Sequence, residues 1–232
     1  MEQNTAYIAH ISHRLKKLYT AAVYDILDKM GLPNQCLDLA IKPIDHTMRI
    51  AGPAFTIAGM ADPRTDDEYS SVSEVKDFVF FRRMYPGCVV LVAASGENRA
   101  GHWGELMSVA SKARGAVGVV IDGGIRDGNL LLQIPDWPVF TRYLSPIESR
   151  LRYRIRFIEG PVAVSGSLTT QVRVSPGEWL FGDMDGVIVI PAEHVEEVLE
   201  KAEAIEGTET AARADIAAGV DVKTVFDKYG RL

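Results

Sequence analysis

Apolar positions recur every three or four residues along the first segment of the chain, which is the spacing of one face of an α-helix. The positions with this spacing are Leu15, Leu18, Ala22, Ile26 and Met30. They predict one amphipathic helix over residues 5–30, ended by Gly31 and Pro33. Two short apolar runs follow, Leu39–Ile44 and Pro53–Met60, and we expect both to be β-strands.

The middle of the chain alternates between buried-type strands and helices. Strands are predicted at Cys88–Ala93, Ala116–Ile121 and Pro138–Tyr143. Helices are predicted at Ser73–Arg83, at Trp103–Arg114 and, as a short segment, directly after Asp127. A polar segment at residues 63–77 is expected to begin with a loop. This alternation is typical of an α/β core.

After Pro146 the pattern changes to short strands separated by turns rich in Gly, Pro and Asp. The strands are predicted at Arg154–Ile158, Val162–Val164, Thr170–Val174, Trp179–Gly182 and Val187–Ile190. We interpret Gly182–Gly186 as a tight hairpin turn and residues 191–218 as a long C-terminal helix. No repeat or linker interrupts the pattern, so we predict a single α/β domain over residues 1–232.

Composition narrows the class of protein. The chain is 47% hydrophobic with a net charge of −6, which is ordinary for a globular protein and argues against a nucleic-acid partner. Its two cysteines, Cys36 and Cys88, lie far apart and form no metal-binding motif, which fits a reducing compartment. The longest apolar stretch, Ala116–Ile121, is too short to span a membrane, and the N-terminus does not resemble a signal peptide. We therefore expect a soluble cytoplasmic protein with no membrane partner.

Two glycine-rich segments carry the candidate chemistry. Residues 101–107 and 120–128 each follow a buried strand and precede a helix, and ligands of open α/β sheets gather at such strand ends. Backbone N–H groups at a helix N-terminus bind carboxylate or phosphate groups. Here the residues that supply them are Gly104, Glu105, Leu106 and Met107. Arg126 can hold the same anion through two parallel hydrogen bonds.

Asp127 supplies an oxygen ligand for a metal ion. One carboxylate, completed by waters and substrate oxygens, suits Mg²⁺ or Mn²⁺ better than zinc, which prefers several nitrogen or sulfur ligands. Glu105 lies at the mouth of the same predicted cleft, where it can orient waters around the metal.

Each of these residues also has an ordinary structural interpretation. Asp127 suits a helix N-cap, Arg126 a surface ion pair, and Glu105 the first turn of a helix. Gly123-Gly124 is typical of a turn, and His102 suits a loop.

Four arginines alternate at positions 150, 152, 154 and 156, so a strand would place them on one face. Such a stripe suits an anion-binding or RNA-binding surface. It equally suits a solvated edge strand or a subunit contact.

The motif around Asp127 resembles the RraA-like family. The resemblance is carried by Glu105-Leu106-Met107, by the twenty-residue gap to Arg126-Asp127, and by the run Arg114–Asp127. Gly52–Thr56, Pro176–Glu178 and Gly182–Pro191 support it, and the similarity extends over roughly residues 15–230. The family includes class II 4-hydroxy-4-methyl-2-oxoglutarate/4-carboxy-4-hydroxy-2-oxoadipate aldolases and the regulator of ribonuclease activity A.

The resemblance implies a compact α/β/β sandwich of the swivelling type, assembled as a homotrimer or homohexamer with sites between subunits. It implies that the amides of residues 104–107 and Arg126 bind a pyruvyl carboxylate, and that Asp127 ligates Mg²⁺. It also implies a catalytic contribution from Glu209 of a neighbouring subunit. Glu105 stands where the aldolases commonly have aspartate. The polar segment Asp62–Arg83, and Val92–Ser95 where the family often has an aspartate, differ from the family pattern.

The activity that follows is cleavage of a 4-hydroxy-2-oxo acid to pyruvate and a second oxo acid, with Arg126 and Glu105 among the catalytic residues. Decarboxylation of oxaloacetate passes through the same enolate and can share the site. Two alternatives stay open. One is a non-catalytic regulator that binds an RNA-processing enzyme, and the other is a lyase for a different sugar-derived oxo acid on the same scaffold.

Overall fold

The structure is a computed structural model that describes residues 2–65, 67–68 and 78–230. Its helices are α1 (Glu2–Leu15), α2 (Thr20–Lys29), α4 (Val79–Arg83), α5 (Glu105–Ala113), α6 (Gly128–Leu131), α7 (Val195–Ala217) and α8 (Val222–Tyr229), with 3-10 turns η1 (Pro33–Gln35) and η2 (Ala192–His194). Its strands are β1 (Lys42–Pro43), β2 (Ile50–Ala61), β3 (Val89–Ala93), β4 (Gly101–Trp103), β5 (Val119–Ile125), β6 (Val139–Leu144), β7 (Tyr153–Ile158), β8 (Val162–Ser165), β9 (Gln171–Val174), β10 (Trp179–Asp183) and β11 (Gly186–Ile190).

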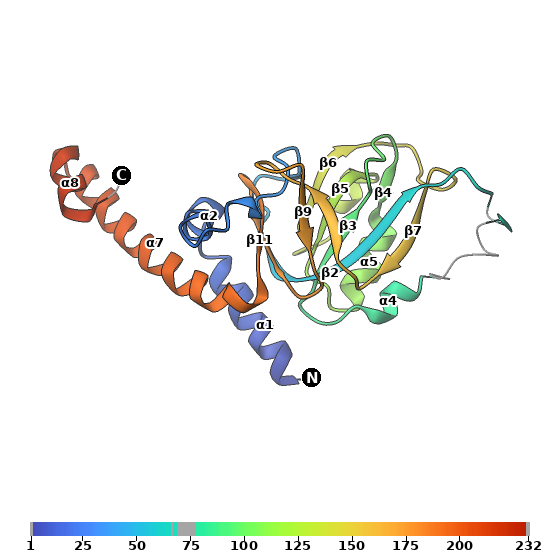
Figure 1. The fold of residues 1–232 in the computed structure, drawn as a ribbon, viewed down its shortest axis with the longest axis horizontal. Helices are drawn as coiled ribbons and strands as arrows, with labels where there is room; N and C mark the ends of the chain where they lie inside the picture. Colours follow the sequence, from blue (N-terminus) through green and yellow to red (C-terminus); the bar gives the residue numbers. More distant parts are fainter. Residues whose placement is uncertain (1, 66, 69–77, 231–232) are drawn as a thin grey trace.

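A mixed sheet forms the centre of the described fold (Figure 1). Its strand order is β1-β6-β5-β3-β2-β10-β11, while β4 pairs with β5 and β7 pairs with β2. The pairs β2–β3, β3–β5 and β5–β6 are parallel, whereas β10 pairs antiparallel with both β2 and β11. The hairpin β8–β9 forms a separate small sheet. The predicted α/β fold is therefore confirmed.

The central strands are apolar along their whole length because both of their faces are buried. In β3, Val89 and Leu91 belong to the cluster that also contains Val164 and Val172 of the β8–β9 hairpin. The intervening residues of β3 pack instead with side chains of the α4, α5 and α6 side of the sheet. Alternate residues of a strand point to opposite faces, so a strand buried on both faces has no polar positions.

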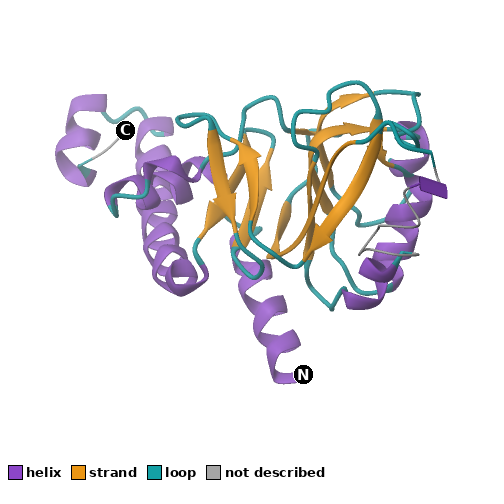
Figure 2. Cartoon of the chain, turned by 45° about the vertical axis from the view of Figure 1, so that its right-hand side comes forward, coloured by secondary structure: helices purple, strands orange, loops and turns teal. Residues whose placement is uncertain are grey.

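The helices cover two separate surfaces of the sheet (Figure 2). On one side, α4 and α6 contribute Phe80 and Leu131 to a cluster with Trp103. On the other side, α1, α2 and α7 pack against β10 and β11. Helix α7 then runs away from the sheet and carries α8 at its far end (Figure 1). None of the helices in the described part of the chain is both long and apolar enough to cross a membrane.

The prediction of one helix over residues 5–30 is wrong, because the chain forms α1 and α2 with a break between them. The second helix begins at Thr20, whose backbone N–H and hydroxyl both donate to the Asp183 carboxylate, at 2.8 and 2.7 Å. This carboxylate comes from β10, so it stabilises the new helix start through a tertiary contact. A periodic pattern within the first thirty residues does not contain that information.

Other boundaries differ more modestly from the predictions. The predicted strand Leu39–Ile44 is reduced to β1, and the C-terminal helix begins as η2 before α7. The predicted helix Ser73–Arg83 is observed as α4 at its C-terminal end, and residues 73–77 lie outside the described residues, as does part of the predicted loop at 63–77. The predicted hairpin turn is confirmed, since Asp183 pairs with Gly186 between β10 and β11.

The predicted arginine stripe is only partly on a strand, because Arg154 and Arg156 lie on β7 whereas Arg150 and Arg152 lie in the turn before it. Within the described sheet β7 pairs with β2 alone, which agrees with the edge-strand interpretation. Arg156 donates to the Asp62 carboxylate at 2.6 Å, and this carboxylate is 2% exposed. At least this arginine therefore serves to join β7 to the end of β2.

Candidate functional site

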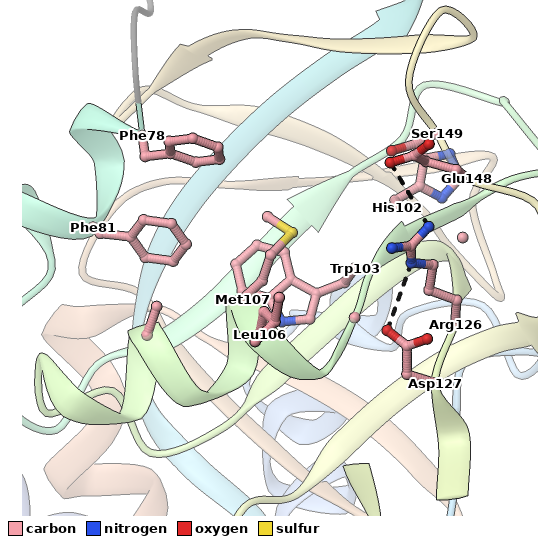
Figure 3. A pocket seen from close by; sticks show the side chains of 13 residues that line it. Phe78, Phe81, His102, Trp103, Leu106, Met107, Arg126, Asp127, Glu148 and Ser149 are labelled. Atoms are coloured by element: carbon pink, nitrogen blue, oxygen red, sulfur yellow. Dashed lines mark ion pairs between the residues drawn. The ribbon is translucent and has the colours of Figure 1, made fainter. Parts of the chain in front are cut away.

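A cavity of about 430 Å³ lies at the carboxyl ends of β4 and β5, beside the first turn of α5 (Figure 3). It is lined by Phe78, Phe81, Gly101, His102, Trp103, Gly104, Leu106, Met107, Ala110, Arg126, Asp127, Glu148 and Ser149. Five of the residues predicted to carry chemistry therefore meet in one cavity. These are Gly104, Leu106, Met107, Arg126 and Asp127.

Strand pairing fixes the position of Arg126. Strands β4 and β5 are parallel, and the Arg126 N–H donates to the Trp103 carbonyl at 2.9 Å directly after β5 ends. Gly101 lies under this residue, and a Cβ atom there would stand 2.9 Å from the Arg126 Cβ. Only a residue without a side chain allows the two strand ends to approach this closely.

The Asp127 side chain is held against the start of α5. Its Oδ2 atom accepts a hydrogen bond from the Glu105 N–H at 3.3 Å and lies 3.5 Å from Arg126 Nε. A Cβ atom on Gly104 would stand 2.6 Å from the same oxygen, so glycine is required for this contact. Asp127 does occupy the N-cap position of α6, but with a φ of 63° and no capping hydrogen bond from its side chain. A left-handed backbone is uncommon at non-glycine residues, and the residues that adopt it cluster at functional sites.

The hydrogen-bond donors beside Asp127 are the Arg126 guanidinium and the first turn of α5. The Arg126 side chain is 38% exposed, and its Nη1 lies 3.8 Å from Glu148 Oε1. The distances from the Arg126 guanidinium to the two carboxylates, 3.5 Å to Asp127 and 3.8 Å to Glu148, are long for ion pairs. The guanidinium therefore retains hydrogen-bond donors for a ligand. The N–H groups of Leu106 and Met107 belong to the first turn of α5, where no intrahelical acceptor exists. Arg126 and this helix start can therefore hold one carboxylate together.

The metal-binding capacity of the site rests on Asp127. Among the described residues, no three His, Cys, Asp or Glu side chains gather in a group that can hold a metal ion. A single, partly exposed carboxylate does not suit zinc, but it suits a hard cation whose other ligands are waters and substrate oxygens. The donor set fits Mg²⁺ or Mn²⁺ held jointly by the protein and a ligand.

His102, which lines the cavity, forms a buried pair with Glu97. The His102 ring is fully buried in β4, so the prediction of a loop residue is wrong. Its Nδ1 accepts from the Gly124 N–H at 3.1 Å, and its Nε2 lies 2.9 Å from Glu97 Oε2, which assigns the proton to Nε2. Burial lowers the pKa of His102, and the opposing effect of the Glu97 carboxylate is smaller.

The lowered pKa of His102 makes the fold sensitive to acid. In the unfolded chain histidine takes up a proton near pH 6.5, whereas the folded protein resists protonation at this pH, so stability falls as pH decreases below about 6.5. We expect the advantage in unfolding free energy of wild type over His102→Gln to shrink from pH 7.5 to pH 5.5. Urea denaturation at both pH values measures it. An unchanged difference would contradict the neutral, buried state of His102.

The Gly123-Gly124 pair is not the turn that its sequence suggests, because both residues lie within β5. A Cβ atom on Gly123 would stand 2.6 Å from His102 Nδ1, and one on Gly124 would stand 2.2 Å from the Tyr143 ring. The two glycines therefore let two rings pack directly on a strand.

Two predicted residues lie outside the described cavity. Glu105 contributes its backbone N–H to Asp127, but its side chain does not line the cavity. Glu209 lies on α7, on the opposite side of the sheet from α5, where its carboxylate accepts from the Tyr19 hydroxyl and from Arg213 at 3.1 Å. Within one chain Glu209 does not join the site, and its catalytic role from a neighbouring subunit stays a prediction.

Sequence reasoning did not identify Phe78, Phe81, Glu148 or Ser149 as site residues. The two phenylalanines lie at the start of α4 and within it, and Glu148 and Ser149 lie in the loop between β6 and β7. None of them belongs to a motif. Only the folding of distant segments onto the ends of β4 and β5 brings them to the cavity.

Comparison with known proteins places the chain in a family context. The model of the RraA-like family, described as Aldolase/RraA, matches residues 20–189. Protein DlpA of Legionella pneumophila is 26% identical over 210 residues, which is 90% of this chain, but the chain spans only 32% of that protein's length. The Halalkalibacterium halodurans protein named "Putative 4-hydroxy-4-methyl-2-oxoglutarate aldolase" is 30% identical over 192 residues, which cover 82% of this chain and 80% of that protein.

A solved structure supports the fold. The crystal structure of Streptomyces coelicolor RraAS2, an unusual member of the RNase ES inhibitor RraA protein family, matches with a TM-score of 0.75 and 23% identity. The match covers 88% of this chain and 97% of that one. At this identity the similarity concerns the fold alone.

Proposed function

Since the chain belongs to the RraA-like family, we propose that it is a divalent-metal-dependent aldolase that cleaves a 4-hydroxy-2-oxo acid and releases pyruvate. One observation carries the proposal. Arg126, the N-terminus of α5 and the carboxylate of Asp127 converge on one cavity, and this carboxylate does not cap helix α6. A protein that only binds another protein has no need for an anion site beside a metal ligand. The aldolase name of the 30% identical relative supports the same class of reaction.

Substrate binding begins at the pyruvyl carboxylate. Arg126 and the N–H groups of Leu106 and Met107 hold this group, and the helix dipole adds to the attraction. Asp127 would hold the Mg²⁺ or Mn²⁺ ion, which supplies Lewis-acid polarisation of the 2-oxo group and neutralises developing charge. Gly104 leaves room for the Asp127 carboxylate close to the helix start, so the anion site and the metal ligand lie next to each other.

Bond cleavage requires a base at the 4-hydroxyl group. Glu148 lines the cavity, whereas the Glu105 side chain does not, so Glu148 is the better placed of the two in this chain. When the hydroxyl proton leaves, the C3–C4 bond breaks and its electron pair stays on the pyruvyl part as an enolate. Arg126 stabilises that charge, and protonation at C3 completes pyruvate. Decarboxylation of oxaloacetate gives the same enolate, and we include it in the proposal.

The first test is release of pyruvate from oxaloacetate and from 4-hydroxy-4-methyl-2-oxoglutarate, with Mg²⁺ or with EDTA. We expect release that depends on Mg²⁺ and that falls by about two to three orders of magnitude in Asp127→Ala, since the variant loses its metal ligand. Asp185→Ala is the matched control, because Asp185 is an exposed aspartate in the β10–β11 turn. Release that EDTA does not affect, or that survives in Asp127→Ala, would contradict the metal-dependent reaction.

The proposal extends to assembly. We propose a homotrimer or homohexamer in which Glu209 of one subunit approaches the cavity of the next. The projection of α7 away from the sheet supports it, because Glu209 stands on this projecting helix (Figure 1). Light scattering measures the mass of the assembly directly, and a monomeric, active enzyme would exclude a role for Glu209 at a shared site.

A further inference from the structure

We infer that the part of the substrate beyond its pyruvyl end is apolar, an aryl or branched alkyl group rather than a second carboxylate. The inference rests on the proposed function, because that function places the pyruvyl carboxylate at Arg126. It concerns the opposite end of the same cavity, where the chemical character of the lining changes.

The cavity has a charged end and an apolar end (Figure 3). Arg126, Asp127 and Glu148 stand together on one side of the view. Phe78 and Phe81 stand on the other side, and Leu106 and Met107 lie between the two groups. A ligand held at Arg126 therefore extends along α5 toward the two phenylalanines.

Phe78 and Phe81 form an aromatic wall of the cavity that packs against the core. The Phe81 ring lies 4.2 Å from the ring of Phe80, centroid to centroid, and Phe80 is 3% exposed. Phe80 in turn lies 6.3 Å from the buried ring of Trp103. Phe78 stacks on Phe81 at 6.1 Å with the ring planes 25° apart. Phe81 is thus supported from behind by buried rings and presents an aromatic surface to the cavity.

The helix α5 continues the apolar surface. Met107 and Ala110 both line the cavity and are three residues apart, so they share one helix face. Neither can donate a hydrogen bond from its side chain to a carboxylate. The described surface from Met107 to Phe81 therefore offers apolar contact, and its lining side chains supply no hydrogen-bond donor to a carboxylate.

The charges of the described lining residues disfavour a second substrate carboxylate at this end. Among the described lining residues the cation is Arg126, and the anions are Asp127 and Glu148. The pyruvyl carboxylate already takes Arg126 in the proposed reaction. A second carboxylate against Phe81 would lose its hydration without gaining a cation, whereas an aryl group there gains from leaving water.

The reaction that follows is a retro-aldol cleavage of R–CH(OH)–CH₂–CO–COO⁻, in which R is the apolar group. The hydroxyl proton passes to a base, the C3–C4 bond breaks, and the electron pair remains on the pyruvyl fragment. That fragment takes up one proton. The products are the aldehyde R–CHO and pyruvate, so atoms and electrons balance without any oxidant or reductant.

The test compares 4-hydroxy-2-oxo-4-phenylbutanoate with 4-hydroxy-4-methyl-2-oxoglutarate, which carries a carboxylate at the remote end. We expect kcat/KM to favour the phenyl substrate by about tenfold or more. Exchange of pyruvate methyl protons for deuterium, followed by NMR, reports the pyruvyl end alone. Exchange without preference for the phenyl substrate overturns this inference and leaves the proposed function standing. Absence of exchange from a folded, Mg²⁺-loaded protein overturns both.

Substitution of Phe81 distinguishes a role in substrate preference from a role in packing alone. We expect Phe81→Ala to lower kcat/KM for the phenyl substrate by about tenfold more than for the dicarboxylate. Phe157→Ala is the matched control, because Phe157 is an exposed phenylalanine on β7 that does not line the cavity. If Phe81→Ala instead dissociates an oligomer and leaves the substrate ratio unchanged, Phe81 belongs to a subunit contact and the inference is overturned.

Discussion

Replacement of Arg126 by alanine is expected to lower kcat/KM for pyruvate release by about three orders of magnitude while the protein stays folded. The guanidinium has two tasks in the proposed reaction, since it binds the pyruvyl carboxylate and then faces the charge of the enolate. A charge-assisted hydrogen bond contributes about 1.5–3 kcal/mol, and a donor aimed at developing charge contributes a similar amount. Steady-state kinetics with oxaloacetate measures the loss.

Arg126→Ala should change the free energy of unfolding only slightly. Arg126 is 38% exposed on its side chain, and its carboxylate neighbours lie at 3.5 and 3.8 Å. Exposed pairs of this kind contribute at most about 1 kcal/mol. Arg126→Lys should retain part of the activity, because lysine keeps the charge but not the planar pair of donors. Arg173→Ala, an exposed arginine on β9, is the matched control. An active Arg126→Ala enzyme would remove Arg126 from the carboxylate site.

The convergence of the two glycine-rich segments could be predicted because it follows from the architecture. Buried strands that alternate with helices predict a parallel sheet, and parallel strands place their carboxyl ends along one edge. The predicted strands before Gly104 and Arg126 are observed as β3 and β5, which are parallel neighbours, so the proximity of the two segments needs no information about side chains. The short strand β4, which directly precedes Gly104, was not predicted. The same reasoning predicts an anion site, since a helix start and an arginine share this edge.

What the sequence did not predict depends on contacts between distant segments. The break between α1 and α2 is stabilised by Asp183, which is more than 160 residues away from Thr20. Glu97 and His102 are close in sequence, yet their burial depends on the sheet that surrounds them. Glu148 and Phe81 reach the cavity from a loop and from a short helix. Local periodicity contains none of these contacts, because each depends on where another element packs.

The glycine pair in β5 is the clearest case in which a local rule and the structure disagree, and Gly124→Ala tests it. A Cβ atom at Gly124 would stand 2.2 Å from the Tyr143 ring and 2.7 Å from the Ala100 carbonyl oxygen. The ring must move to admit a methyl group, and its hydroxyl then loses the 3.2 Å hydrogen bond to that carbonyl. Overpacking costs about 1–3 kcal/mol and the hydrogen bond about 1 kcal/mol. We expect unfolding free energy to fall by roughly 2–4 kcal/mol, measured by urea denaturation.

The control for this substitution has the opposite expected sign. Gly207 lies within α7, and a Cβ atom there would meet nothing within 4 Å, so Gly207→Ala should stabilise the protein by up to about 1 kcal/mol. The Gly124→Ala cost should also be smaller in a Tyr143→Ala background, where the obstructing ring is gone, and the remaining cost measures the contact with the Ala100 carbonyl. If Gly124→Ala is as stable as wild type, β5 does not approach Tyr143 closely and the pair acts as the simple turn that its sequence suggests. If the cost is observed, packing of the two rings requires the glycines. This packing lies beside the cavity, since Gly124 donates its N–H to His102 and pairs with Gly101 beneath Arg126.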